Sequence, residues 1–136
     1  MNAALSLSMI RVIAKNNLSF DDVKTLSKIL DISVITIRNS IKNNNCLYEV
    51  EPFSGAWEEE RHELKRISDA YMSDELKLFD VIELDGEEVE LLTPEFLRNS
   101  IAGLREIEIQ TQRNVDLENG YIKTPEEFVP HDEDWT

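Results

Sequence analysis

The chain has 136 residues, of which 41% are hydrophobic and 31% charged, with a formal net charge of −14. This length allows one domain, or a small helical domain with an accessory region, and excludes a large multidomain enzyme. The hydrophobic content is that of a folding protein, which excludes disorder of the whole chain. No apolar run approaches the roughly 20 residues that cross a bilayer, and the single cysteine, Cys46, cannot form an internal disulfide. We expect a cytoplasmic protein without a membrane association.

The charge is distributed unevenly along the chain. Residues 1–50 contain six Lys/Arg and four Asp/Glu, a net +2, whereas residues 51–136 contain eight against twenty-four, a net −16. A polyanion such as DNA would be repelled by the second part over about a Debye length, near 8 Å at physiological salt. Only the first part is therefore suited to bind DNA.

The first 45 residues are predicted to form three helices. In residues 4–15, Leu5, Met9 and Ile13 recur at helical spacing, which predicts a first amphipathic helix. Ser19 then precedes a second helix as its N-cap, and Asp31 ends it.

The third predicted helix begins after Ser33 and ends at the asparagines of residues 43–45. Ile37 and Ile41 lie four residues apart and form its apolar side. The three helices are expected to pack into a trihelical unit over short loops.

The next segments are predicted from alternation and helical spacing. Residues 46–50 alternate as a short strand, and Pro52 and Gly55 close the following loop, which we take as a linker. In residues 56–72, the steps of seven between Trp57, Leu64 and Tyr71 predict a helix that lies against another helix.

Residues 80–92 are predicted to form a β-hairpin. Two alternating runs flank Asp85-Gly86, a dipeptide that favours a type I′ turn with both residues at the centre. Thr93-Pro94 begins another helix, which is expected to fade near Arg113. Residues 114–136 contain too few large apolar residues to form a core, so we expect an acidic tail that is disordered alone. Deletion of Leu117 to Thr136 is expected to leave the fold intact.

Together these elements predict a mainly α protein with a small β-hairpin, in the α+β class. The expected organisation is a helix-turn-helix domain at 1–45, a short strand and linker at 46–55, an acidic helix-hairpin-helix region at 56–113 and the acidic tail at 114–136.

Residues 26–41, LSKILDISVITIRNSI, carry a recognisable pattern. The small Ser27, Leu30 and Ile32 around a turn, Ser33 as a cap and Ile37 within the next helix resemble the helix-turn-helix core of bacterial and phage transcription regulators, over residues 20–43. The resemblance implies a second helix that lies in the major groove of DNA. Asp31 stands where that family usually has glycine, and it tolerates the left-handed conformation better than most residues.

By position, the resemblance implies that six residues face duplex DNA: Ser33, Val34, Ile35, Arg38, Asn39 and Lys42. Arg38 suits guanine, Asn39 suits adenine and Lys42 suits a phosphate. Val34 and Ile35 are apolar where polar residues are usual, so they would contact thymine methyl groups or a protein. Because the net charge of +2 is small, tight binding would need a homodimer or a partner. A trihelical core without any nucleic-acid role is the alternative.

The acidic part contains candidate partner-binding residues. Aromatic anchors interleaved with acids are typical of a peptide that folds on a basic protein surface, although a simple solubilising tail would have the same charge. The candidates are Trp57, Tyr121, Glu126, Glu127, Phe128, Asp132, Glu133, Asp134 and Trp135.

The sequence predicts no catalytic residue, no metal site and no cofactor. Cys46 lacks a neighbouring histidine, since the two histidines are His62, in a charged helix, and His131, in the tail. The glycines are isolated, so there is no phosphate-binding loop. The carboxylates are expected to form a solvated acidic face rather than a reactive pair.

Two functions from different classes remain open. The first is a DNA-binding transcription regulator of bacterial or phage type whose acidic part binds a basic protein, as an antitoxin binds a toxin. The second is a phage-type inhibitor or anti-defence factor whose acidic half mimics DNA and which acts by protein contact alone. Salt-dependent binding to duplex DNA distinguishes them.

Overall fold

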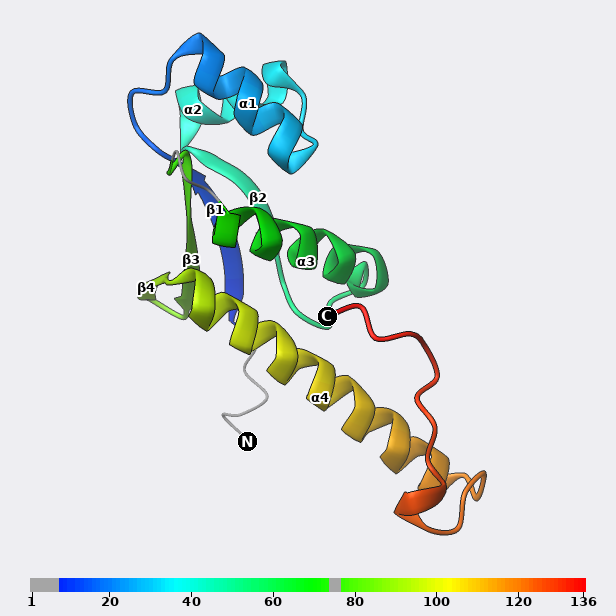
Figure 1. The fold of residues 1–136 in the computed structure, drawn as a ribbon. Coiled ribbons are helices and arrows are strands. Elements are labelled where there is room, and N and C mark those ends of the chain that lie inside the picture. Colours follow the sequence, from blue (N-terminus) through cyan, green and yellow to red (C-terminus); the bar gives the residue numbers. More distant parts are fainter. Residues whose placement is uncertain (1–7, 74–76) are drawn as a thin grey trace.

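The computed structural model describes residues 8–73 and 77–136, which form a mixed α+β fold with a four-stranded antiparallel sheet. The strands are β1 (Met9–Ala14), β2 (Cys46–Val50), β3 (Phe79–Asp85) and β4 (Glu88–Leu92), in the order β2-β1-β3-β4. The helices are α1 (Phe20–Leu30), α2 (Val34–Asn43), α3 (Trp57–Ser73) and α4 (Pro94–Glu118), and a 3₁₀ turn spans Pro125–Glu127. Figure 1 shows α1 and α2 at one end of the sheet and α4 running away from the other.

The segment predicted as the first helix is a strand wherever the structure describes it. In β1 the side chains of Ile10, Val12 and Ala14 alternate into the core, and β1 pairs with both β2 and β3. β-Branched residues favour a strand, and pairing along both edges outweighs the helical spacing that we read from the sequence. Residues 4–7 lie outside the described residues. The described part of residues 1–45 therefore contains two helices, not the predicted three.

The two helices between β1 and β2 have the predicted ends. Ser19 caps α1 through a reciprocal capping box with Asp22. Asp31 ends α1 in the left-handed conformation, with φ 54° and ψ 45°, as expected for the turn. Ser33 caps α2 by accepting a hydrogen bond from the Thr36 amide. The Ser27 hydroxyl donates to the Ile32 carbonyl and holds the turn between the helices.

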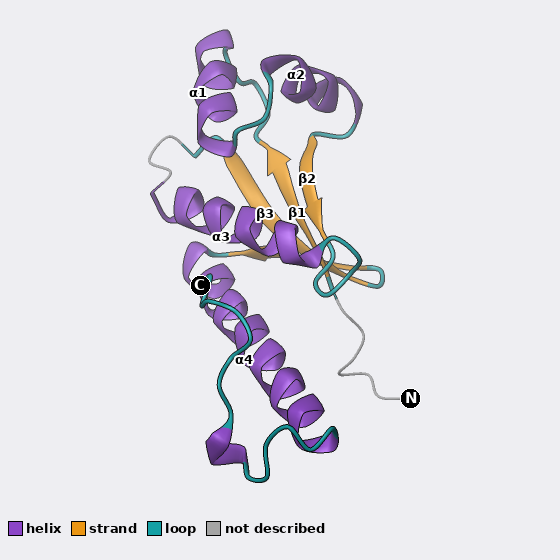
Figure 2. Cartoon of the chain, turned by 90° about the vertical axis from the view of Figure 1, so that its right-hand side faces the viewer, coloured by secondary structure: helices purple, strands orange, loops and turns teal. Residues whose placement is uncertain are grey.

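One sheet joins strands that lie far apart in the sequence. The β1 strand from the predicted first domain lies between β2, from the predicted linker, and β3, from the predicted acidic region. Figure 2 shows α3 crossing this sheet. The Tyr71 hydroxyl of α3 donates to the Leu92 carbonyl at 2.7 Å, and the Tyr71 ring lies 5.4 Å from that of Phe79. The core thus lies between α3 and the buried face of the sheet, with α1 and α2 packed at its end.

The predicted β-hairpin is confirmed, but its turn lies one residue further along. Asp85 pairs with Glu88, so the two central residues are Gly86 and Glu87. Only Gly86 has a positive φ, at 62°, which is the requirement of a type II′ turn and not of the predicted type I′.

The tail is ordered, contrary to the prediction. The α4 helix continues past Arg113 to Glu118, and Gly120 with φ 73° redirects the chain. The following residues return along α4 until Trp135 is buried against α3 (Figure 1). The tail has no core of its own, and it is ordered by packing against the rest of the chain.

Candidate functional site

The exposed face of α2 is the first candidate site. Ile35, Arg38, Asn39 and Lys42 are all exposed and follow one another at steps of three, one and three residues, so they share one side of the helix. The opposite side buries Ile37 completely. Four of the six residues predicted to face DNA are therefore presented together to solvent.

The other two predicted DNA-facing residues have structural roles in the same turn. The Ser33 hydroxyl is engaged with Thr36, both as the helix cap and as a donor to the Thr36 hydroxyl at 2.7 Å. Val34 is partly buried against the core. Ile35, in contrast, is 73% exposed. Ile35 thus adds an apolar group to the exposed side of the helix, beside Arg38 and Asn39.

A shallow hollow of about 280 Å³ adjoins this face, between α1 and α2. Its apolar walls include Phe20, which is 62% exposed, and Arg38 and Lys42 lie at its border. The Lys24 ammonium lies 5.5 Å from the centre of the Phe20 ring. Two cations thus border an apolar depression, and a third lies beside its Phe20 wall, an arrangement that suits an anionic ligand with a planar or apolar part.

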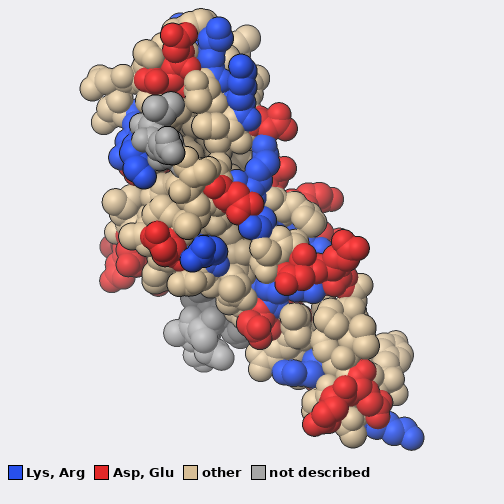
Figure 3. All heavy atoms as spheres, in the orientation of Figure 1, with Lys and Arg blue, Asp and Glu red and all other residues tan. Residues whose placement is uncertain are grey.

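Acidic residues lie close to this face as well. Asp21 and Asp22 occupy the first turn of α1, and Asp31 lies in the turn before α2. Figure 3 shows Lys and Arg side chains along the upper part of the molecule, with Asp and Glu side chains between them. The local field for a polyanion is therefore only weakly attractive.

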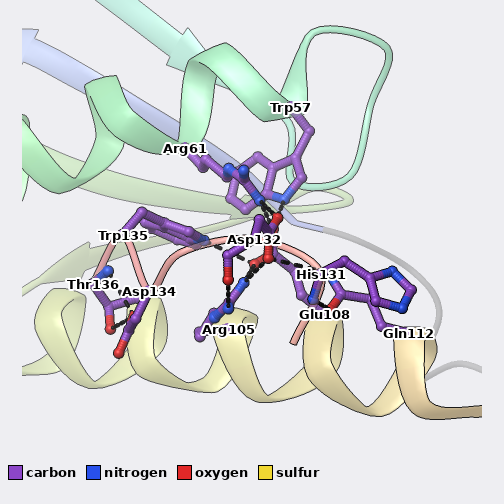
Figure 4. Close-up of polar contacts among 10 residues, drawn as sticks. All are labelled: Trp57, Arg61, Arg105, Glu108, Gln112, His131, Asp132, Asp134, Trp135 and Thr136. Atoms are coloured by element: carbon purple, nitrogen blue, oxygen red, sulfur yellow. Dashed lines mark hydrogen bonds and ion pairs between the residues drawn. The ribbon is translucent and has the colours of Figure 1, made fainter. Parts of the chain in front are cut away.

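The second candidate site is a buried polar cluster between α3, α4 and the end of the chain (Figure 4). At its centre, Glu108 of α4 accepts hydrogen bonds on both carboxylate oxygens. Oε2 accepts from Trp57 at 2.7 Å and Arg61 at 2.9 Å, and Oε1 accepts from Arg105 at 2.9 Å and Trp135 at 2.8 Å. These four bonds satisfy the buried carboxylate.

Asp132 completes the cluster from the tail. Its Oδ2 accepts from Arg61 at 2.9 Å, and its Oδ1 accepts from Arg105 at 2.8 Å and Gln112 at 3.3 Å. Two guanidinium groups therefore face two carboxylates, so the cluster is electrically balanced. In the part of the chain that the structure describes, the only buried cluster atoms without a partner are the Nε atoms of Arg61 and Arg105.

The cluster lowers the pKa of both carboxyl groups. Burial alone would raise the pKa of Asp132, but hydrogen bonds from Arg105 and Arg61 outweigh burial and lower it well below its usual range. Burial likewise opposes the charged form of Glu108, and hydrogen bonds from Trp135, Arg105 and Arg61 lower its pKa. Both groups thus stay ionised at neutral pH.

The aromatic residues of the cluster are internal. The rings of Trp57 and Trp135 meet edge to face, 5.6 Å apart, and the side chains are only 6% and 7% exposed. Trp57, Asp132 and Trp135 were three of the candidate partner-binding residues. In the structure they instead hold the tail against α3 and α4.

The remaining candidates of that set lie at the surface, with Phe128 partly buried. Tyr121 is 75% exposed, and Glu126, Glu127, Glu133 and Asp134 are exposed. The structure therefore does not bring the predicted partner-binding residues into one surface.

Sequence reasoning missed Arg61, Arg105, Glu108 and Gln112. The carboxylates were expected to form a solvated acidic face, and this is wrong for Glu108 and Asp132, which bind the two arginines of the cluster. One signal was available, since Trp57/Arg61 and Arg105/Glu108 are pairs at helical spacing. What joins the two pairs is the packing of α3 on α4, which the sequence does not reveal.

A pH dependence follows from the two lowered pKa values. A carboxyl group with a lowered folded-state pKa stabilises the fold above its ordinary pKa, near 4, and this contribution is lost as the pH falls further. We expect the free energy of unfolding to decrease as the pH is lowered from about 5, in denaturant titrations at pH 7, 5, 4 and 3. Asp132→Asn should give a lower stability at pH 7 and a shallower decrease. An unchanged slope in this variant would contradict the assignment.

Comparisons of this chain with protein-family models, with curated proteins and with solved structures found no match. Among the described residues, no helix is both long enough and apolar enough to cross a bilayer. Also among these residues, no group of three or more His, Cys, Asp or Glu side chains is arranged to hold a metal ion.

Proposed function

We propose that the unit formed by α1 and α2 binds duplex DNA, with α2 in the major groove. The observation that carries the proposal is the single exposed stripe of Ile35, Arg38, Asn39 and Lys42 on a helix that follows a left-handed turn at Asp31. In helix-turn-helix proteins, the residues at the start of the second helix contact base edges in this way.

Each residue of the stripe has a role that its chemistry supplies. Arg38 donates two hydrogen bonds to guanine O6 and N7, and Asn39 pairs with adenine N6 and N7. Lys42, a turn later, neutralises a phosphate, while Ile35 contacts a thymine methyl group. Lys24 on α1 is exposed, and in this proposal it contacts the DNA backbone on the flanking side.

The distribution of the acids is compatible with this proposal. In Figures 1 and 2, α4 and the turn that follows it extend away from α1 and α2, so the acids at the far end of α4 are remote from the proposed DNA face. Repulsion by exposed charges falls off over roughly 8 Å at physiological salt. The acids of α1 remain nearby, and we therefore expect weak binding by a monomer, with dimerisation or a partner increasing the affinity.

The test is salt-dependent binding to duplex DNA by Arg38→Ala and Lys42→Ala variants. Lys42→Ala should weaken binding to all sequences and reduce the slope of log affinity against log salt by about one unit. Arg38→Ala should reduce discrimination at one base pair by about 1–3 kcal/mol.

Lys123→Ala is the matched control, because it removes the same charge from an exposed position in the tail. Binding that is equally affected by this control, or unaffected by either α2 variant, would reject α2 as the recognition helix. Binding can be measured by fluorescence anisotropy with a library of labelled duplexes.

The second candidate function, from a different class, is inhibition by protein contact through the acidic half. The observation that favours it is a group of acids gathered at the hairpin: Glu83, Asp85, Glu88 and Glu90, which line a hollow of about 400 Å³. An acidic surface of this kind suits a basic protein groove that otherwise holds nucleic acid. An inhibitor of this class would show no DNA binding that depends on Arg38 or Lys42, and would compete with DNA for its target.

A further inference from the structure

Among the described residues, the β4 strand forms one edge of the sheet, and its outer side pairs with no other strand. In the sheet order β2-β1-β3-β4, β4 pairs with β3 alone among the described residues. Four of its five residues, from Glu88 to Leu91, are exposed, and only Leu92 is buried. A free edge offers unpaired backbone N–H and C=O groups to another strand.

The side chains of β4 separate into two chemically distinct faces. Residues that pair directly across antiparallel strands lie on the same face, and the register pairs Glu90 with Glu83, and Glu88 with Asp85. Glu88 and Glu90 thus share the face that carries the acids of β3. Val89 and Leu91 point to the other face, where they are 62% and 63% exposed.

The acidic face is under electrostatic strain. Glu83 and Glu90 are direct cross-strand neighbours of like charge, which destabilises a sheet. Burial, and then the charges of Glu90 and Asp85, raise the pKa of Glu83 above its ordinary value. In the part of the chain that the structure describes, no ion pair to Lys or Arg is found for Glu83, Glu88 or Glu90. Cations placed here would relieve the repulsion.

The apolar face continues from β4 onto β3. Val89 pairs with Leu84, and Leu91 pairs with Ile82, and both β3 side chains are only partly buried. Four neighbouring aliphatic side chains are therefore left partly or largely in water on this face. Covering them would add hydrophobic stabilisation to the backbone hydrogen bonds of an added strand.

We propose that the free edge of β4 binds an extended segment of a partner protein whose residues alternate between Lys or Arg and large apolar side chains. The added strand would place its cations opposite Glu88 and Glu90, and its apolar side chains beside Val89 and Leu91. The acidic half would thus recognise its partner by strand addition. This inference is independent of DNA binding by α2, since it uses other residues on another part of the fold.

The charge of the β4 edge favours a basic strand over two other possible binding partners, a second copy of the chain and a nucleic acid. A second copy of the chain pairing through its own β4 would bring Glu88 and Glu90 of both copies onto one small sheet surface, adding to the existing repulsion. A nucleic acid would meet the same acids with its phosphates. A basic, alternating strand is the one that complements both faces.

The test uses the full-length protein and a synthetic peptide, Thr-Lys-Val-Lys-Val-Lys-Val-Thr, blocked at both ends. We expect saturable binding in an NMR titration, with the largest amide shifts in residues 82–92 and slower hydrogen exchange in β4. Glu90→Lys should weaken binding on the order of tenfold, because it reverses the charge opposite a peptide lysine. It is expected to fold, since it replaces the Glu83–Glu90 repulsion by an attraction.

The controls separate strand addition from general charge attraction. A peptide of the same composition with its lysines grouped together cannot present alternate faces, and it should bind at least several-fold more weakly. Glu126→Lys makes the same charge change at an exposed tail position and should alter the affinity by less than about twofold. Equal binding of the two peptides, equal loss in the two variants, or self-association through β4 without peptide binding would each overturn the proposal. A loss of DNA binding in the Arg38→Ala variant leaves these outcomes unchanged.

Discussion

Replacing Glu108 by alanine is expected to lower the free energy of unfolding by about 3–5 kcal/mol. The Glu108 side chain is 7% exposed and accepts hydrogen bonds from two arginines and two tryptophans. Without Glu108, the two buried arginines Arg61 and Arg105 share a single carboxylate of the cluster, that of Asp132. One buried positive charge is then uncompensated, which is strongly destabilising. Urea titrations followed by circular dichroism and tryptophan fluorescence measure the change.

Glu106→Ala is the matched control for this prediction. Glu106 lies on the same helix, two residues away, and is exposed. Its replacement should change the free energy of unfolding by less than about 0.5 kcal/mol. Similar effects of the two substitutions would show that the buried cluster does not hold α3, α4 and the tail together.

The second large effect is expected for Trp135→Ala, which should lower the free energy of unfolding by about 3–5 kcal/mol. The substitution removes a buried ring that packs on Trp57 and donates to Glu108. Tyr121→Ala is the control: Tyr121 is also an aromatic residue of the tail, but it is 75% exposed. It should leave the stability nearly unchanged.

This pair of variants tests whether the tail is part of the fold or a free partner-binding peptide. If Trp135→Ala left the stability unchanged, the tail would not dock on α3 and α4 in solution. If it dissociates a partner without destabilising the chain, Trp135 is an intermolecular anchor instead. Because Trp135 and Glu108 are in direct contact, the double variant should cost less than the sum of the two single variants.

Local chemistry allowed the ends of α1 and α2 and the hairpin to be predicted from the sequence. Ser19 and Ser33 cap their helices by bonding backbone amides three residues away, and Asp31 adopts the left-handed conformation that the turn requires. These contacts lie within a few residues of one another, so residue type and spacing are enough to identify them. The residues predicted to face DNA came from the helix-turn-helix resemblance, and the helical spacing of Arg38, Asn39 and Lys42 accounts for their lying on one side of α2.

Contacts between distant segments decided the rest. β1 has a helical spacing of apolar residues, and it becomes a strand because β2 and β3 pair with both of its edges. The tail contains too few apolar residues for a core of its own, yet it is ordered because two of its residues are held by α3 and α4. Asp132 accepts hydrogen bonds from Arg61 and Arg105. Trp135 donates to Glu108 and packs on the Trp57 ring. The sequence by itself therefore determined α1, α2, the β-hairpin and the charge of each part, because these depend on neighbouring residues. Only the tertiary structure decided the central strand, the docking of the tail and the buried ion cluster, because their stability comes from groups separated by tens of residues.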